Sequence, residues 1–108
     1  MKPTAMHHIL IVDDSPEDRL IVRRLLTQVA PGTYTFSEVD RGDRVLAACH
    51  AALPDCVLLD QNLPDMDGLD VITALRKTSD VPVVLLTGLG NETLAVAALQ
   101  QGAQDYLI

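Results

Sequence analysis

Short apolar runs alternate with longer segments of helical periodicity along the 108 residues of this chain. The apolar runs have the length and composition of buried strands, and they span residues 9–12, 34–39, 56–60, 83–87 and 105–108. The intervening segments predict helices over residues 16–30, 43–52, 69–77 and 92–101. Strand and helix in regular alternation predict an α/β protein with a parallel sheet.

The first predicted helix carries a start signal and an amphipathic pattern. Ser15 precedes Pro16, as expected for an N-cap residue followed by proline at the first helical position. Arg19 and Arg23 fall on a different side of the helix from an apolar stripe. The stripe consists of Val22, Leu25 and Val29.

Five strands joined by four helices favour an open, doubly wound sheet in the order 2-1-3-4-5 over a closed barrel. In that order the chain changes direction between strands 1 and 3, and the carboxyl ends of these strands form a crevice. Asp13 and Asp14 follow the first strand, Asp60 ends the third and Thr87 ends the fourth. We therefore expect three carboxylates and a hydroxyl to converge on one pocket.

Right-handed crossovers place the first helix on one face of this sheet and the three later helices on the other. The sequence ends without a fifth helix, so the first helix alone is expected to cover its face. Apolar side chains should then be exposed at Val57, Leu59 or their neighbours, within 83–86, and at Leu107. An exposed patch of this kind predicts self-association of the chain into a homo-oligomer.

Length and charge restrict the classes of partner. A chain of 108 residues forms one domain. Its 8 Lys and Arg against 15 Asp and Glu give a net charge of −7, which argues against direct binding to nucleic acid or to an anionic membrane. Cys49 and Cys56 lack metal-site spacing and are expected to be reduced. No signal peptide or membrane span is evident, and the expected location is the cytoplasm.

The predicted pocket has a distinct chemistry because its carboxylates repel one another. Two unit charges about 4 Å apart repel by about 4 kcal/mol at an effective dielectric constant of about 20. Either one carboxyl stays protonated or a cation binds. Oxygen ligands without thiolates suit Mg²⁺ or Mn²⁺, and the main-chain carbonyl of Asn62 can complete the site. Such an ion commonly neutralises phosphoryl oxygens, which makes Asp60 a candidate nucleophile that forms an aspartyl phosphate.

Two further acids follow Asp60 in the chain. Asp65 and Asp67 lie between Pro64 and Gly68, in a segment with the composition of a turn. We interpret both as turn or helix-cap residues.

Four segments resemble the receiver domain of two-component response regulators: ILIVDDSPED, VLLDQNLPDMDG, VVLLTG and GAQDYL. The resemblance extends from about residue 9 to residue 108 and implies a flavodoxin-like fold. It implies that Asp60 is the phosphoacceptor, that Asp14 binds Mg²⁺ directly and that Asp13 does so largely through water. It also implies roles for the main-chain carbonyl of Asn62 in metal binding and for Thr87 and Tyr106 in switching.

The sequence departs from that family at its end. Receiver domains carry a lysine three residues after the switch aromatic, followed by a fifth helix, whereas this sequence stops at Ile108. We therefore expect residues 7–108 to form a C-terminally truncated receiver domain.

The resemblance implies a phosphorelay function without turnover of an external substrate. A sensor histidine kinase or histidine phosphotransfer protein would donate the phosphoryl group, and an output domain or partner would meet the fourth helix and fifth strand. One alternative is a pseudo-receiver that serves as an interaction module. Another is an aspartyl-phosphate phosphatase of the haloacid dehalogenase type, which is disfavoured because Asn62 stands where such enzymes have a second aspartate.

Overall fold

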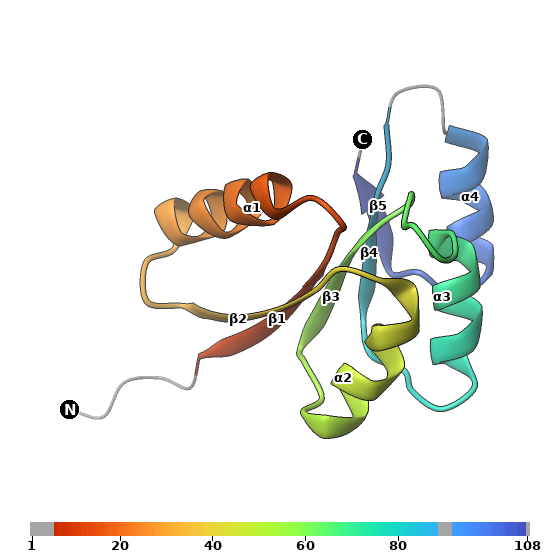
Figure 1. Ribbon diagram of the computed structural model, residues 1–108, viewed down its shortest axis with the longest axis horizontal. Helices are drawn as coiled ribbons and strands as arrows, with labels where there is room; N and C mark the ends of the chain where they lie inside the picture. Colours follow the sequence, from red (N-terminus) through yellow and green to blue (C-terminus); the bar gives the residue numbers. More distant parts are fainter. Residues whose placement is uncertain (1–5, 89–91, 108) are drawn as a thin grey trace.

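The computed structural model describes residues 6–88 and 92–107, in which strands and helices alternate (Figure 1). The strands are β1 (His7–Val12), β2 (Tyr34–Val39), β3 (Cys56–Asp60), β4 (Val83–Leu86) and β5 (Asp105–Leu107). The helices are α1 (Pro16–Val29), the short 3₁₀ helix η1 (Gly42–Arg44), α2 (Val45–Ala51), α3 (Gly68–Arg76) and α4 (Glu92–Gln100).

The described strands form one parallel sheet in the order β2-β1-β3-β4-β5. The α/β class with a parallel sheet is therefore confirmed. The predicted start of the second helix at Asp43 is wrong, because residues 42–44 form the 3₁₀ helix η1 and α2 begins at Val45. The predicted end of the last strand at Ile108 lies outside the described residues. None of the helices in the described part of the chain has the length and apolar character needed to cross a lipid bilayer.

The main core lies between the sheet and helices α2, α3 and α4 (Figure 1). The sequence predicted exposure at Val57, Leu59 or their neighbours. Val57 and Leu59 themselves are 0% exposed within this core, so the prediction is wrong for these two residues. Strand residues alternate between the faces, which puts these two on the side of the three helices. Their neighbour Leu58 is half-buried, and Leu107 is 57% exposed, as predicted.

Helix α1 lies apart from the other helices (Figure 1). It begins as predicted, since the Ser15 hydroxyl accepts a hydrogen bond from the Asp18 N–H at 3.2 Å. All of α1 is described, and none of its residues is buried. Leu25 and Val29 of its apolar stripe are 56% and 83% exposed. The amphipathic pattern therefore does not correspond to a buried helix face.

The loop between β3 and α3 is fixed at several points. The Gly68 N–H donates to the Gln61 carbonyl at 2.9 Å, and Asp67 caps α3 by accepting from the Asp70 N–H at 3.2 Å. The Asp65 carboxylate accepts from the N–H groups of Gly42 and Asp43, each at 2.8 Å. Asp67 is thus a helix cap, as predicted, whereas Asp65 stabilises the start of a different helical segment.

Gly42 allows this loop to approach η1. It is buried, and a Cβ atom at its position would meet Met66 Cγ and would lie 2.6 Å from Met66 Sδ. We predict that Gly42→Ala lowers the free energy of unfolding by about 1–3 kcal/mol, because the added methyl overpacks this contact. Urea denaturation should measure the loss, and Met66→Ala should reduce it by making room. An equal loss in both backgrounds would contradict the steric explanation.

Candidate functional site

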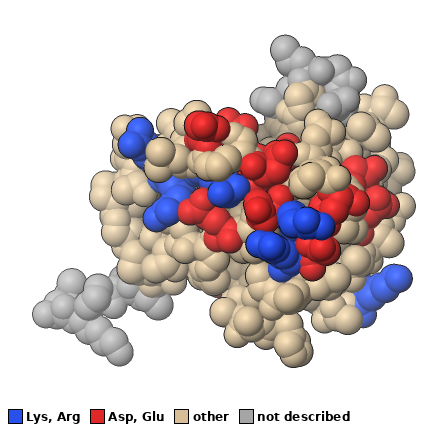
Figure 2. Space-filling model, viewed as in Figure 1, with Lys and Arg blue, Asp and Glu red and all other residues tan. Residues whose placement is uncertain are grey.

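Three carboxylates meet at the carboxyl edge of the sheet. Asp13 and Asp14 directly follow β1, and Asp60 is the last residue of β3, which pairs with β1. Each offers a carboxylate oxygen, and these oxygens lie within 4.8 Å of one another. Within residues 6–88 and 92–107, no other group of three His, Cys, Asp or Glu side chains meets this condition. Figure 2 shows Asp and Glu side chains gathered across this view of the molecule, with Lys and Arg between them.

Backbone contacts hold Asp13 firmly at the end of β1. Its N–H donates to the Val39 carbonyl at 3.2 Å, which extends the pairing of β1 with β2 by one residue. Its carboxylate accepts from the Ser15 N–H at 2.9 Å, and its carbonyl accepts from Arg19 Nη1 at 2.6 Å. Asp13 is buried, Asp60 is half-buried and Asp14 is exposed. The cluster is therefore closed towards the sheet and open to solvent at Asp14.

Burial and mutual repulsion disfavour ionisation in the cluster. Burial, reinforced by the charge of Asp13, raises the pKa of Asp60 to about 6. Burial also raises the pKa of Asp13, although the hydrogen bond from the Ser15 N–H acts in the opposite direction. The fold therefore keeps two carboxyl groups in a setting where a bound cation or a proton lowers the electrostatic energy.

Thr87 lies beside the acidic cluster. It follows β4, whose last residue, Leu86, is the register partner of Asp60. Its hydroxyl donates to the Gly88 carbonyl at 3.0 Å. Thr87, Asp13 and Asp60 line one shallow hollow together with residues of α1. The complete lining is Asp13, Asp18, Ile21, Val22, Asp60, Leu86 and Thr87. The predicted convergence of carboxylates and a hydroxyl at adjacent strand ends agrees with this geometry.

The remaining predicted site residues lie further along the chain. Asn62 is exposed two residues beyond Asp60, and an isolated bridge pairs it with Asp67. Tyr106 lies on β5 beside Leu85 of β4, and its side chain is outside what the structure describes.

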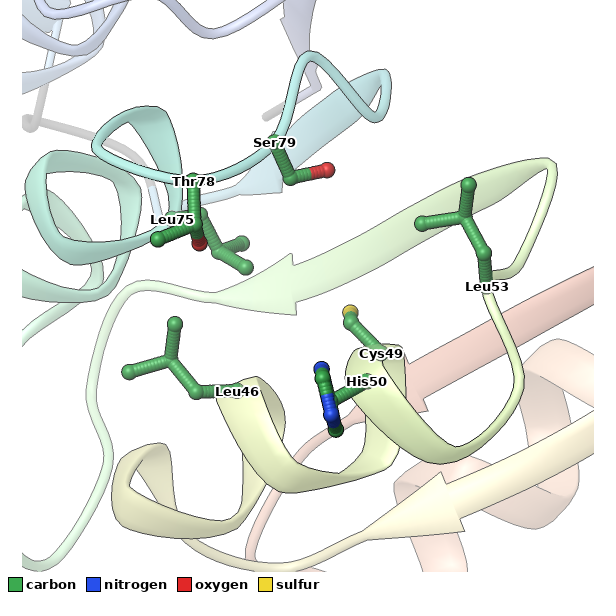
Figure 3. Close-up of a pocket in the computed structure, with 7 residues that line it drawn as sticks. All are labelled: Leu46, Cys49, His50, Leu53, Leu75, Thr78 and Ser79. Carbon is green, nitrogen blue, oxygen red and sulfur yellow. The ribbon is translucent and has the colours of Figure 1, made fainter.

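A separate hollow lies near the opposite edge of the sheet, between α2 and the end of α3 (Figure 3). Cys49 and His50 line it from α2, and Thr78 and Ser79 line it from the connection to β4. It holds no acidic side chain and is separate from the acidic cluster. Both Cys49 and Cys56 are free thiols, as predicted.

Sequence reasoning missed one residue that contacts the site, Arg19, and one buried polar residue next to Asp60 in the chain, Gln61. Arg19 was assigned only to a helix face, yet its guanidinium contacts the Asp13 carbonyl. Gln61, next to Asp60, is 3% exposed, and its side-chain oxygen has no hydrogen-bond partner among the described residues. A basic residue five positions after Asp14 was the available signal for Arg19, whereas the apolar setting of Gln61 depends on long-range packing.

Comparisons with known proteins agree with this geometry. The family model of the response regulator receiver domain matches residues 9–108. The chain is 38% identical over 106 residues to the DNA-binding response regulator MtrA of Mycolicibacterium smegmatis, covering 97% of this chain and 45% of MtrA. It is 36% identical over 104 residues to the cyclic di-GMP phosphodiesterase response regulator RpfG of Xanthomonas campestris, covering 94% of this chain and 27% of RpfG.

The solved structures include a similar receiver domain. The BeF₃-activated N-terminal receiver domain of RstA from Klebsiella pneumoniae superimposes with a TM-score of 0.82 at 33% identity, covering 93% of this chain and 83% of that one.

The relatives bear on what the whole protein binds. The chain spans less than half the length of MtrA or RpfG. Because MtrA is a DNA-binding protein, the predicted absence of nucleic-acid binding finds no support among the relatives. The match over residues 9–108, together with these identities, shows that the chain belongs to the response regulator receiver domain family.

Proposed function

We propose that residues 7–108 form a receiver domain in which Asp60 accepts a phosphoryl group from a phosphohistidine. The observation that carries this proposal is the convergence of Asp13, Asp14 and Asp60 at adjacent strand ends. A carboxylate oxygen of Asp60 attacks phosphorus, the phosphorus–nitrogen bond of the donor breaks, and the donor histidine leaves with the bonding electron pair. The product is an aspartyl phosphate on this chain, so no external substrate is turned over.

The donor set of the cluster fits Mg²⁺, or Mn²⁺ in its place. It consists of carboxylate oxygens, which are the ligands that these ions prefer. Asp13, Asp14, Asp60 and the main-chain carbonyl of Asn62 would hold the ion, which when bound neutralises phosphoryl oxygens. The raised pKa values of Asp13 and Asp60 support this assignment, because a cation stabilises both ionised carboxylates.

Phosphorylation would change the surface formed by α4 and β5. We infer that the Thr87 hydroxyl turns from the Gly88 carbonyl towards the phosphoryl group and that Tyr106 repacks in response. The exposed apolar side chains of α4, Leu94, Val96 and Leu99, support a surface that meets a partner or output domain. A sensor histidine kinase or phosphotransfer protein in the cytoplasm would be the donor. Self-association through the α1 side of the sheet stays a prediction that sedimentation can test.

Beryllofluoride with Mg²⁺ tests the identity of the phosphoacceptor. We predict that this phosphoryl mimic binds the chain and that Asp60→Asn abolishes binding, because an amide lacks the anionic oxygen that bonds beryllium. Fluorine NMR would detect the bound species. Asp67→Asn is the matched control, since asparagine also caps helices, and it should bind normally. Binding to the Asp60→Asn protein would refute the assignment. Absence of binding to the unchanged protein would leave an interaction module as the better interpretation.

Removal of one carboxylate tests the metal site. We predict that Asp14→Ala weakens Mg²⁺ binding at least about tenfold, because a direct ligand is lost. Asp80→Ala removes the same charge from an exposed residue remote from the cluster and should have little effect. Isothermal titration calorimetry would measure both. Equal losses would show that Mg²⁺ responds to overall charge and not to the cluster.

The pKa of Asp60 predicts how stability depends on pH. Because the folded-state pKa is about 6 and the ordinary value is 3.8, ionisation of Asp60 lowers stability as pH rises through this interval. In metal-free buffer, Asp60→Asn should raise the free energy of unfolding at pH 7 by on the order of 1 kcal/mol, after allowance for exposure to solvent. The gain should decrease as pH falls through this interval and vanish only below the ordinary pKa of 3.8. A gain that is independent of pH would rule out charge as its cause.

Amide shifts test the output surface. With beryllofluoride and Mg²⁺ present, we predict changes in NMR amide signals across α4 and β5, because Thr87 and Tyr106 change position. The Asp60→Asn protein in the same buffer should show no such changes. Unchanged signals in both proteins would disprove the proposed switch while leaving phosphoacceptor chemistry intact.

A further inference from the structure

Helix α1 is attached to the sheet by charged side chains. It has no buried residue, and two of its arginines share one carboxylate on the edge strand β2. Arg19 Nε donates to Glu38 Oε1 at 2.8 Å, and Arg23 Nη1 donates to Glu38 Oε2 at 2.7 Å. The Arg23 guanidinium also lies 5.4 Å from the centre of the Phe36 ring. These contacts connect α1 to the edge strand β2.

Arg19 differs from Arg23 because its guanidinium also donates a hydrogen bond to the main chain of the acidic cluster. While Nε contacts Glu38, Nη1 donates to the Asp13 main-chain carbonyl at 2.6 Å. The Arg19 side chain is only 17% exposed, compared with 47% for Arg23. The planar fork of a guanidinium can serve two acceptors at fixed angles, which an ammonium group cannot do. Arg19 therefore connects α1, β2 and the carboxyl end of β1.

The contact falls on the peptide group that joins Asp13 to Asp14. The Asp13 N–H is fixed by the Val39 carbonyl, so Arg19 fixes the other side of the same residue. The direction of the Asp13 carbonyl determines the orientation of the following peptide plane. That plane sets where the Asp14 side chain begins. A change at Arg19 should therefore displace Asp14 relative to Asp60.

We propose that Arg19 is a positioning residue for the acidic cluster: by bridging Glu38 and the Asp13 carbonyl, it holds Asp14 in register with Asp60 and makes cation binding depend on how α1 sits on the sheet. The expected effect of Arg19 on Mg²⁺ binding rests on the proposed function. The expected effect of Arg19 on the position of Asp14 does not.

An electrostatic role and a positioning role of Arg19 predict opposite changes in Mg²⁺ affinity when Arg19 is replaced by a neutral residue. Arg19 carries a positive charge close to the cluster, so removing that charge should by electrostatics alone strengthen Mg²⁺ binding. Loss of a positioning contact should weaken it, because partners that orient metal ligands commonly contribute tenfold or more to affinity. The sign of the change therefore distinguishes the two roles.

The test compares three variants by Mg²⁺ titration calorimetry, with circular dichroism to verify folding. We expect Arg19→Gln to weaken Mg²⁺ binding about tenfold. Arg23→Gln removes the same charge from the same carboxylate without touching Asp13, and it should bind as the unchanged protein does or slightly more tightly. Arg19→Lys keeps the charge, but its single ammonium nitrogen cannot occupy both the Nε and the Nη1 positions, so it should also bind Mg²⁺ more weakly. Equal or tighter binding by Arg19→Gln, or full affinity in Arg19→Lys, overturns the proposal.

A metal-free measurement separates this proposal from the proposed function. Arg19→Gln should shift the NMR amide signals of Asp14 and Ser15 more than Arg23→Gln does. If the unchanged protein binds no Mg²⁺, the metal assignment fails, and these shifts alone decide the role of Arg19. Small, equal shifts in the two variants overturn it. Should Arg19→Gln not fold, Arg19→Lys takes its place in both measurements.

Discussion

Repulsion among Asp13, Asp14 and Asp60 is the constraint on which the rest of the site depends. The three carboxylates converge because β1 and β3 are paired neighbours that end at the same edge of the sheet. Val12, just before Asp13, pairs with both Val39 and Leu59, so strands on both sides fix its position. The core beneath the sheet stabilises this arrangement despite the charges. The fold thus holds the three carboxylates close together despite their repulsion, and a bound cation would lower the electrostatic energy of the site.

The two faces of the sheet contribute differently to this site. Helices α2, α3 and α4 cover a packed apolar core, and the Asp65 carboxylate ties the loop after Asp60 to the start of η1. On the other face, Arg19 and Arg23 of α1 both donate hydrogen bonds to Glu38 of β2. The Asp60 side of the cluster is therefore supported by close packing, whereas the Asp13 carbonyl is contacted by a charged side chain of α1.

The sequence predicted what local pattern determines. Alternation of apolar runs and helical segments indicated the parallel α/β class, and acids at strand ends identified Asp13, Asp14 and Asp60 as neighbours. It did not predict contacts that depend on how distant segments meet. The stripe of Leu25 and Val29 has helical periodicity, but periodicity does not determine whether a helix face is covered. The carboxylate of Asp65 stabilises backbone groups more than twenty positions away, and no local signal indicates such a partner.

The pKa of Asp60 in solution tests this account most directly. Carbon-13 NMR of the Asp60 carboxyl carbon, followed against pH, would measure it with and without Mg²⁺. We expect a value of about 6 in the metal-free protein and a clear decrease when Mg²⁺ is present. An ordinary value near 3.8 under both conditions would contradict the account. It would show that burial and the neighbouring carboxylates do not disfavour ionisation of Asp60.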